Sequence, residues 1–154
     1  MFILGVAIFL FMIWLAITIL GGNVDNYISI PSQLIVFAPL LGTLAATRSF
    51  KVFYGGLKAV ILPKSSITEE LRGQAMSLFR LLSKVTAMAV GIGALIGLTN
   101  VLYGLDLGNP DVIHILGINA ASALLSLVHG LFIIAAVFEP VVFNLKKRRD
   151  ADRK

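Results

Sequence analysis

The sequence contains no cysteine, and only 14% of its 154 residues are charged. Without cysteine, disulfide-stabilised folds, thiol catalysis and cysteine-ligated metal sites are excluded. The low charge excludes a water-soluble domain, since such domains have about 25% charged and roughly 45–50% apolar residues. Here 58% of the residues are hydrophobic and the mean hydropathy is +0.94. The sequence therefore predicts an integral membrane protein, for which the bilayer acts as solvent.

Catalytic motifs are also missing, because the sequence has no HExxH, no GxSxG and no phosphate-binding loop. Its two histidines, His114 and His129, lie on one long apolar segment without an obvious ligating or second-shell partner. We therefore expect no enzyme activity, no cofactor and no metal.

Four apolar segments predict an all-α polytopic membrane protein with four transmembrane helices. The first segment, at about 1.5 Å per residue, is long enough to cross a hydrocarbon core. A cleaved signal peptide is the alternative for it, but no basic region precedes it and no small-x-small cleavage site follows, so we expect a retained helix. The predicted single membrane domain, 1–154, has spans at about 2–20, 30–47, 85–105 and 112–145, a short helical cytoplasmic loop at 48–84 and a basic tail at 146–154.

Three prolines fall inside these segments, and Pro31 suits the first turn of the second helix. Pro39 is in the middle of the second segment and is expected to bend it. The fourth segment would be roughly 50 Å long as a single helix, longer than a membrane requires. We therefore expect its end to project into water, with a kink at Pro140.

The basic residues predict the orientation. Seven of the thirteen lysines and arginines lie within 48–84 and the other six within 146–154. The two remaining connections, 21–29 and 106–111, carry acidic residues only. The positive-inside rule therefore places the loop and both termini in the cytoplasm. The same distribution, confined to two regions, argues against a nucleic-acid partner.

The cytoplasmic loop is expected to be helical. Residues 49–62 alternate apolar side chains with Lys51 and Lys58, as in an amphipathic helix at the headgroups. A second helix is expected to begin after Ser66 or Thr68, either of which can cap it, and to continue through Arg80 into the third span. Two roles remain open for the basic residues, which could anchor the loop to anionic lipid or contact a partner. The four candidates are Lys51, Lys58, Arg72 and Arg80.

Small and polar residues form a stripe along each of the last two spans. Spacings of three, four and three residues place the polar residues of the fourth span on one helix face. One interpretation is helix packing through small residues and interhelical hydrogen bonds, and the other is a polar passage or a groove for a partner's helix. The stripes are Thr86, Gly93, Gly97 and Asn100 in the third span, and Asn119, Ser122, Ser126 and His129 in the fourth.

Several short runs resemble one known family. They are Gly21 to Asn23, Pro31 to Val36, Leu41 to Leu44, Leu57 to Ala59, Gly91 to Leu98, Ala123 to Ser126 with Gly130, Pro140, and Leu145-Lys146. In their order these runs resemble the MotA/TolQ/ExbB proton-channel subunits of flagellar stators and energy-transducing complexes, and the likeness covers roughly two-thirds of the chain. The chain is most similar to a compact MotA that lacks the large cytoplasmic domain. It departs from the family pattern at Ala87, where the family has proline, and at Ala94 and Leu127, where it has hydroxyl residues.

The resemblance implies a homopentamer around two single-pass helices of a MotB- or ExbD-type partner. In such complexes the carboxylate that carries the proton belongs to the partner, and the proton or sodium motive force does mechanical work. The alternative is a structural scaffold of the same fold that does not conduct ions.

The predicted topology can be tested by cysteine labelling, since the chain has no cysteine of its own. Cysteines introduced at Asp25 and Asn109 should react with an impermeant maleimide added outside intact cells, whereas one at Ser65 should react only after lysis. The reverse pattern would overturn the orientation.

Overall fold

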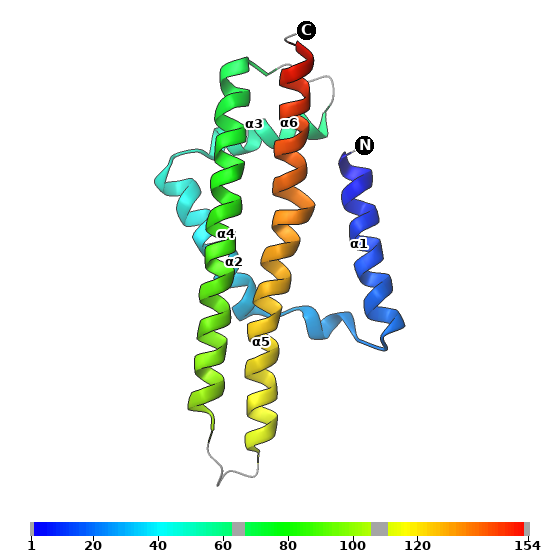
Figure 1. Cartoon of the computed structure of the whole chain (residues 1–154), viewed down its shortest axis with the longest axis vertical. Coiled ribbons are helices and arrows are strands. Elements are labelled where there is room, and N and C mark those ends of the chain that lie inside the picture. The colour runs from blue at the N-terminus through cyan, green and yellow to red at the C-terminus, as the bar shows by residue number, and fades with distance from the viewer. Residues whose placement is uncertain (1, 63–66, 106–110, 153–154) are drawn as a thin grey trace.

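The computed structural model describes residues 2–62, 67–105 and 111–152, and these are helical without any strand. Figure 1 shows the elements in chain order. They are α1 (Phe2–Ile19), the 3-10 helix η1 (Val24–Tyr27), α2 (Ile30–Ala46), α3 (Phe50–Ile61), α4 (Glu69–Tyr103), α5 (Val112–Ile133), the π-helix η2 (Ile134–Phe138) and α6 (Glu139–Asp152). The predicted all-α membrane fold is confirmed at this level.

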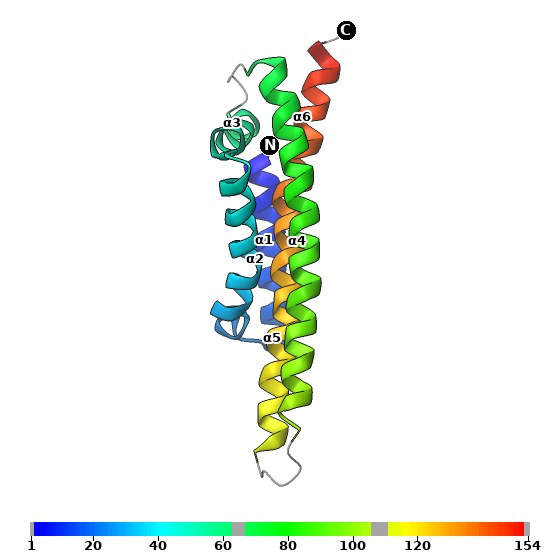
Figure 2. The same cartoon turned by 90° about the vertical axis from the view of Figure 1, so that its left-hand side faces the viewer.

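A long antiparallel pair forms the body of the molecule. One member is α4, and the other is the continuous rod of α5, η2 and α6 (Figures 1 and 2). Helix α2 packs along this pair, α3 crosses it near both chain termini, and α1 stands to one side (Figure 1). We call the end with the termini the α3 end, and the opposite end, where α4 stops and α5 starts, the hairpin end.

Three of the helical stretches are long and apolar enough to cross a membrane. They are α1, α4 and the rod from Val112 to Asp152. Helices α2 and α3 meet the same test only as a pair, bent by 112° between them. The structure thus has three candidate spans, or four if the bent pair counts as one.

The sharp bend between α2 and α3 has a local cause at Arg48. This residue has φ +50°, the left-handed conformation that usually falls to glycine after a helix. The Ser49 N–H donates to the Leu44 carbonyl (3.0 Å), and the Arg48 N–H donates to the Ala45 carbonyl (3.1 Å). This is a Schellman motif, and it stops α2 although arginine in this conformation costs about 1–2 kcal/mol.

Helix α4 starts at the alternative of the two predicted caps. Thr68 is the N-cap, and its side chain accepts a hydrogen bond from the Leu71 N–H (3.3 Å). The other predicted cap, Ser66, lies outside the described residues. From Glu69 the helix continues without a break through Arg80 to Tyr103. The second helix predicted for the loop and the predicted third span are therefore one element, as expected.

Neither internal proline interrupts its helix. Pro39 lies within α2, which is continuous from Ile30 to Ala46. Pro140 follows directly on the π-helical turn, where the Glu139 N–H donates to the Ile134 carbonyl, five residues back. Proline has no N–H for the carbonyl four residues back and its ring presses on that carbonyl, so a wider turn relieves both problems. Whether either proline also bends the helix axis stays a prediction.

The hydrophobic core is concentrated at the α3 end. Phe79, Leu82, Val141 and Leu145 are fully buried there between α4 and α6. Helix α3 lies close on α4 because Gly56 has no side chain, and a Cβ at this position would be 2.9 Å from atoms of both Ala75 and Phe79. Helix α3 therefore packs on the bundle instead of lying apart from it.

Glycines also bring α4 and α5 into backbone contact. A Cβ at Gly97 would lie 2.3 Å from the Ala123 Cβ, and one at Gly93 would lie 3.0 Å from the Ser126 Oγ. A Cβ at Gly130 on α5 would lie 1.9 Å from Val90 Cγ2 on α4. Small residues are the usual means by which membrane helices approach closely, since lipid supplies no hydrophobic driving force.

Replacement of Gly97 by alanine should destabilise the fold. The added methyl overlaps Ala123, and overpacking typically costs about 1–3 kcal/mol. The matched control is Gly91→Ala on the same helix, where a Cβ meets nothing within 4 Å. Thermal unfolding in mild detergent should show a lower midpoint for Gly97→Ala and no loss for Gly91→Ala. Equal midpoints for the two variants would contradict the close contact.

Candidate functional site

The eight residues of the two predicted stripes separate into two sets. Thr86, Gly93, Gly97 and Ser126 are buried within the chain where α4 meets α5. The second set is half-buried or exposed, and comprises Asn100, Asn119, Ser122 and His129. In a single chain the first set lies within a helix contact, and a lining role for the eight residues stays a prediction.

Three hydroxyl side chains are buried among the described residues, one on each of three helices. They are Ser32 on α2, Thr86 on α4 and Ser126 on α5. The Ser126 hydroxyl donates to the Ala123 carbonyl of its own helix (2.7 Å). The Ser32 hydroxyl donates to the Ser122 carbonyl (3.0 Å) and thereby joins α2 to α5. Both are satisfied locally, as buried polar groups normally are.

The third hydroxyl is different. Thr86 is fully buried, and its Oγ1 has no hydrogen-bond partner among the described residues. The same holds for the buried Nδ1 of the half-buried His129. A Cβ at Gly130, the residue after His129, would lie 3.4 Å from Thr86 Cγ2, so the two unsatisfied groups are at the same level of the α4–α5 pair. Each unsatisfied buried polar atom costs about 1–3 kcal/mol.

Polar groups at the hairpin end link the two helices once more. The Asn119 side-chain amide donates to the Asn100 carbonyl (3.4 Å). Because α2 reaches α5 only at Ser122, ten residues after α5 begins, about 15 Å of the α4–α5 hairpin extends past α2. Figure 2 shows this extension. Its surface is apolar, with Tyr103 and Ile113 more than four-fifths exposed.

The predicted contact residues of the loop have different environments. Lys51, Lys58 and Arg80 are exposed. Arg72 is half-buried, and its guanidinium forms an ion pair with Asp152 of α6. Arg72 therefore joins the start of α4 to the end of the chain.

Two structural residues were not identified from the sequence. Ser32 lies in the second predicted span, and no role is predicted for its hydroxyl, although a hydroxyl near the start of an apolar helix is a usable signal for an interhelical hydrogen bond. Arg148 was counted as part of a basic tail, but its guanidinium donates to the Ala59 carbonyl (2.6 Å) in the last turn of α3. No sequence pattern indicates that contact, because the two residues are 89 positions apart.

The arrangement supplies hydroxyl, amide and imidazole groups but no carboxylate at the α4–α5 contact. Along α4 the only acidic residues are Glu69 and Glu70 in its first turn, and α5 has none. Within the described residues, no group of three or more histidine, aspartate or glutamate side chains is placed to hold a metal ion. Comparisons of the chain with protein-family models, curated proteins and solved structures find no match.

Thr86→Val tests the unsatisfied hydroxyl. Valine has nearly the same shape and removes the group that lacks a partner, so the isolated subunit should gain about 1 kcal/mol of stability. The control is Ser126→Ala, which removes a satisfied hydroxyl at the same helix contact and should not stabilise. Thermal unfolding of both variants in detergent measures the difference, and a loss of stability for Thr86→Val would show that its hydroxyl has a partner.

Proposed function

We propose that this protein is a stator-like ion-channel subunit with four spans, in which α2 crosses the membrane and α3 lies at its cytoplasmic surface. Both termini are then cytoplasmic, in a bacterial inner membrane. Five copies surround a dimer of single-pass partners of the MotB or ExbD type, and the proton or sodium motive force does mechanical work. The resemblance of the sequence to the MotA/TolQ/ExbB subunits suggests this assembly.

One observation carries the proposal beyond that resemblance. The hydroxyl of Thr86 and the Nδ1 of His129 lie at the same level of the α4–α5 pair, and neither has a hydrogen-bond partner among the described residues. Polar groups in a bilayer require partners, and in membrane proteins such groups commonly belong to ion or proton pathways. Both atoms are enclosed within the subunit, so water between the helices at this level would satisfy them and connect them to a carboxylate on the central partner.

The lack of acidic residues along most of α4 and along α5 is consistent with such a partner. A proton pathway needs a group that changes its charge, and a carboxylate on the central dimer would provide it. A proton gains about 2.3 kcal/mol per 100 mV of membrane potential, which is enough to shift a packed assembly between two states.

A structural scaffold is the second candidate, and a specific observation favours it. Gly93, Gly97 and Ser126 are enclosed by Ala123, Ile35 and each other within one subunit. Packing within the subunit is sufficient to explain these small residues, so an ion path is not needed to account for them. Under this alternative the exposed part of His129 meets a neighbouring copy of the chain and not a conducting helix, while Thr86 stays enclosed in its own subunit.

Proton flux in reconstituted vesicles separates the two candidates. With a MotB- or ExbD-type partner present, the wild-type complex should conduct, and His129→Leu should lower the flux about tenfold, equivalent to about 1.4 kcal/mol in the barrier. His114→Leu is the control, because this histidine is exposed on the same helix near the hairpin end.

Native mass spectrometry of the same preparation should give five subunits to two partners. A ring of subunits that binds no partner and conducts no protons would instead establish the scaffold. A stable monomer or dimer would exclude both.

A further inference from the structure

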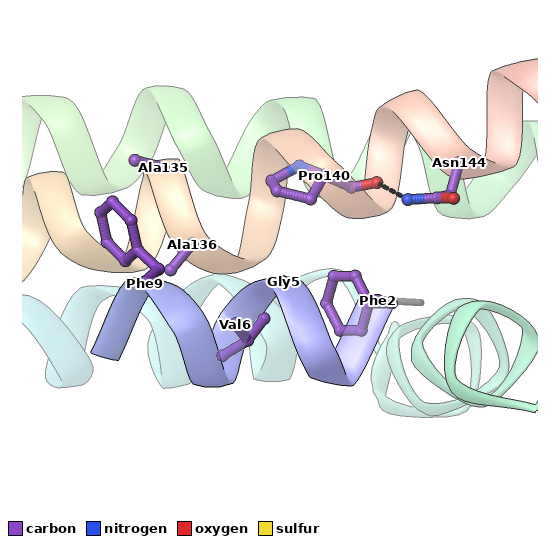
Figure 3. Close-up of a pocket in the computed structure, with 8 residues that line it drawn as sticks. All are labelled: Phe2, Gly5, Val6, Phe9, Ala135, Ala136, Pro140 and Asn144. Carbon is purple, nitrogen blue, oxygen red and sulfur yellow. Dashed lines mark hydrogen bonds between the residues drawn. The ribbon is translucent and has the colours of Figure 1, made fainter. Parts of the chain in front are cut away.

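Helix α1 is separated from the rest of the bundle by two adjoining hollows. The structure describes the whole of α1, and no residue of this helix is buried. The first hollow, about 340 Å³, lies between α1 and the π-helical turn (Figure 3). The second, about 430 Å³, lies between the start of α1, α3 and α6. Phe2 and Asn144 border both, so the two form one groove, which we call the α1 groove.

The inner part of the groove is apolar and lined by small residues. Gly5 and Val6 of α1 line it together with Ala135, Ala136 and Pro140 of the opposite rod (Figure 3). At its deep end the rings of Phe9 and Phe132 pack together, with centroids 5.5 Å apart. This ring contact holds α1 against the rod, while the small residues above it leave the space open.

The outer part of the groove is cationic. Lys147 and Arg148 line it beside Val60 and Ile61 of α3, and no acidic side chain lines either hollow among the described residues. The Arg148 guanidinium uses one N–H on the Ala59 carbonyl, so it is held in place with further donors available. The nearby acidic residues of α6 are engaged elsewhere, Asp150 with Arg149 and Asp152 with Arg72.

We propose that the α1 groove is a binding site for one anionic phospholipid of the leaflet at the α3 end. The phosphate binds at Lys147 and Arg148, and an acyl chain lies along Gly5, Ala135 and Pro140 towards the Phe9–Phe132 pair. Basic pockets between membrane helices recognise lipid head groups in this way, and both lysine and arginine are common phosphate ligands. This site is a property of the single subunit and does not depend on ion conduction.

The order of groups along the groove favours a lipid over a protein helix. An extended hydrocarbon chain is much thinner than a helix, and a cationic mouth above an apolar channel matches the order of groups in an anionic phospholipid.

Native mass spectrometry of the purified full chain tests the site, with phosphatidylglycerol and phosphatidylcholine added separately in mild detergent. The wild type should retain one phosphatidylglycerol at collision energies that remove phosphatidylcholine. Lys147→Gln should lower the retained fraction at least about fivefold through loss of charge, with Lys51→Gln, an exposed lysine outside the groove, as its control.

Gly5→Phe tests the acyl-chain part independently. A Cβ at Gly5 meets nothing within 4 Å, so the ring can fill the groove without a clash. Gly42→Phe on α2 is the matched control, since Gly42 is equally open. The proposal is supported if Gly5→Phe loses bound phosphatidylglycerol and Gly42→Phe retains it.

Three results would overturn it. The first is that Lys147→Gln and Gly5→Phe retain as much phosphatidylglycerol as the wild type. The second is that the wild type retains the two lipids equally, and the third is a cross-link from a cysteine at Gly5 to a helix of another chain. Circular dichroism of each variant establishes that it is folded.

Discussion

The close approach of α4 and α5 is the constraint on which the rest of the structure depends. Three glycines, Gly93, Gly97 and Gly130, let the two backbones meet where any side chain would intrude. Without a hydrophobic force between helices in lipid, such contacts and interhelical hydrogen bonds must hold the bundle together. Helix α2 then joins this pair through Ile35 against Gly93 and through the Ser32 hydroxyl on α5.

The same contact determines which polar groups are satisfied. Ser126 lies in the space that Gly93 leaves, and its hydroxyl donates a hydrogen bond to the Ala123 carbonyl of its own helix. It therefore needs no hydrogen-bond partner from another helix. Thr86 lies one helical level away, beside Gly130, where the backbones are equally close but no acceptor is in reach among the described residues. Tight packing thus produces both a stable helix pair and, among the described residues, a level at which a buried hydroxyl has no hydrogen-bond partner.

Local signals made much of this architecture predictable. Hydropathy located the three candidate spans, and a fourth if the bent pair of α2 and α3 counts as one. The amphipathic pattern of 49–62 predicted α3 to within one residue at each end. The Gly93-x-x-x-Gly97 spacing also predicted a close contact, but not which helix it meets, because spacing defines a face and not its neighbour. The bend at Arg48 was missed because arginine carries no signal for a left-handed residue. The α1 groove is likewise absent from local pattern, since it is formed by residues from both ends of the chain.

The π-helical turn at Ile134–Phe138 sets the rotational phase of α6. One residue more in a turn changes the direction of every later side chain by about 100° relative to a regular helix. With a regular turn, Arg148 would point away from the Ala59 carbonyl, and the buried Val141 and Leu145 would rotate with it. The side of α6 that meets α3 is therefore determined about two turns earlier, inside the apolar rod, by the π-helical turn that accommodates Pro140.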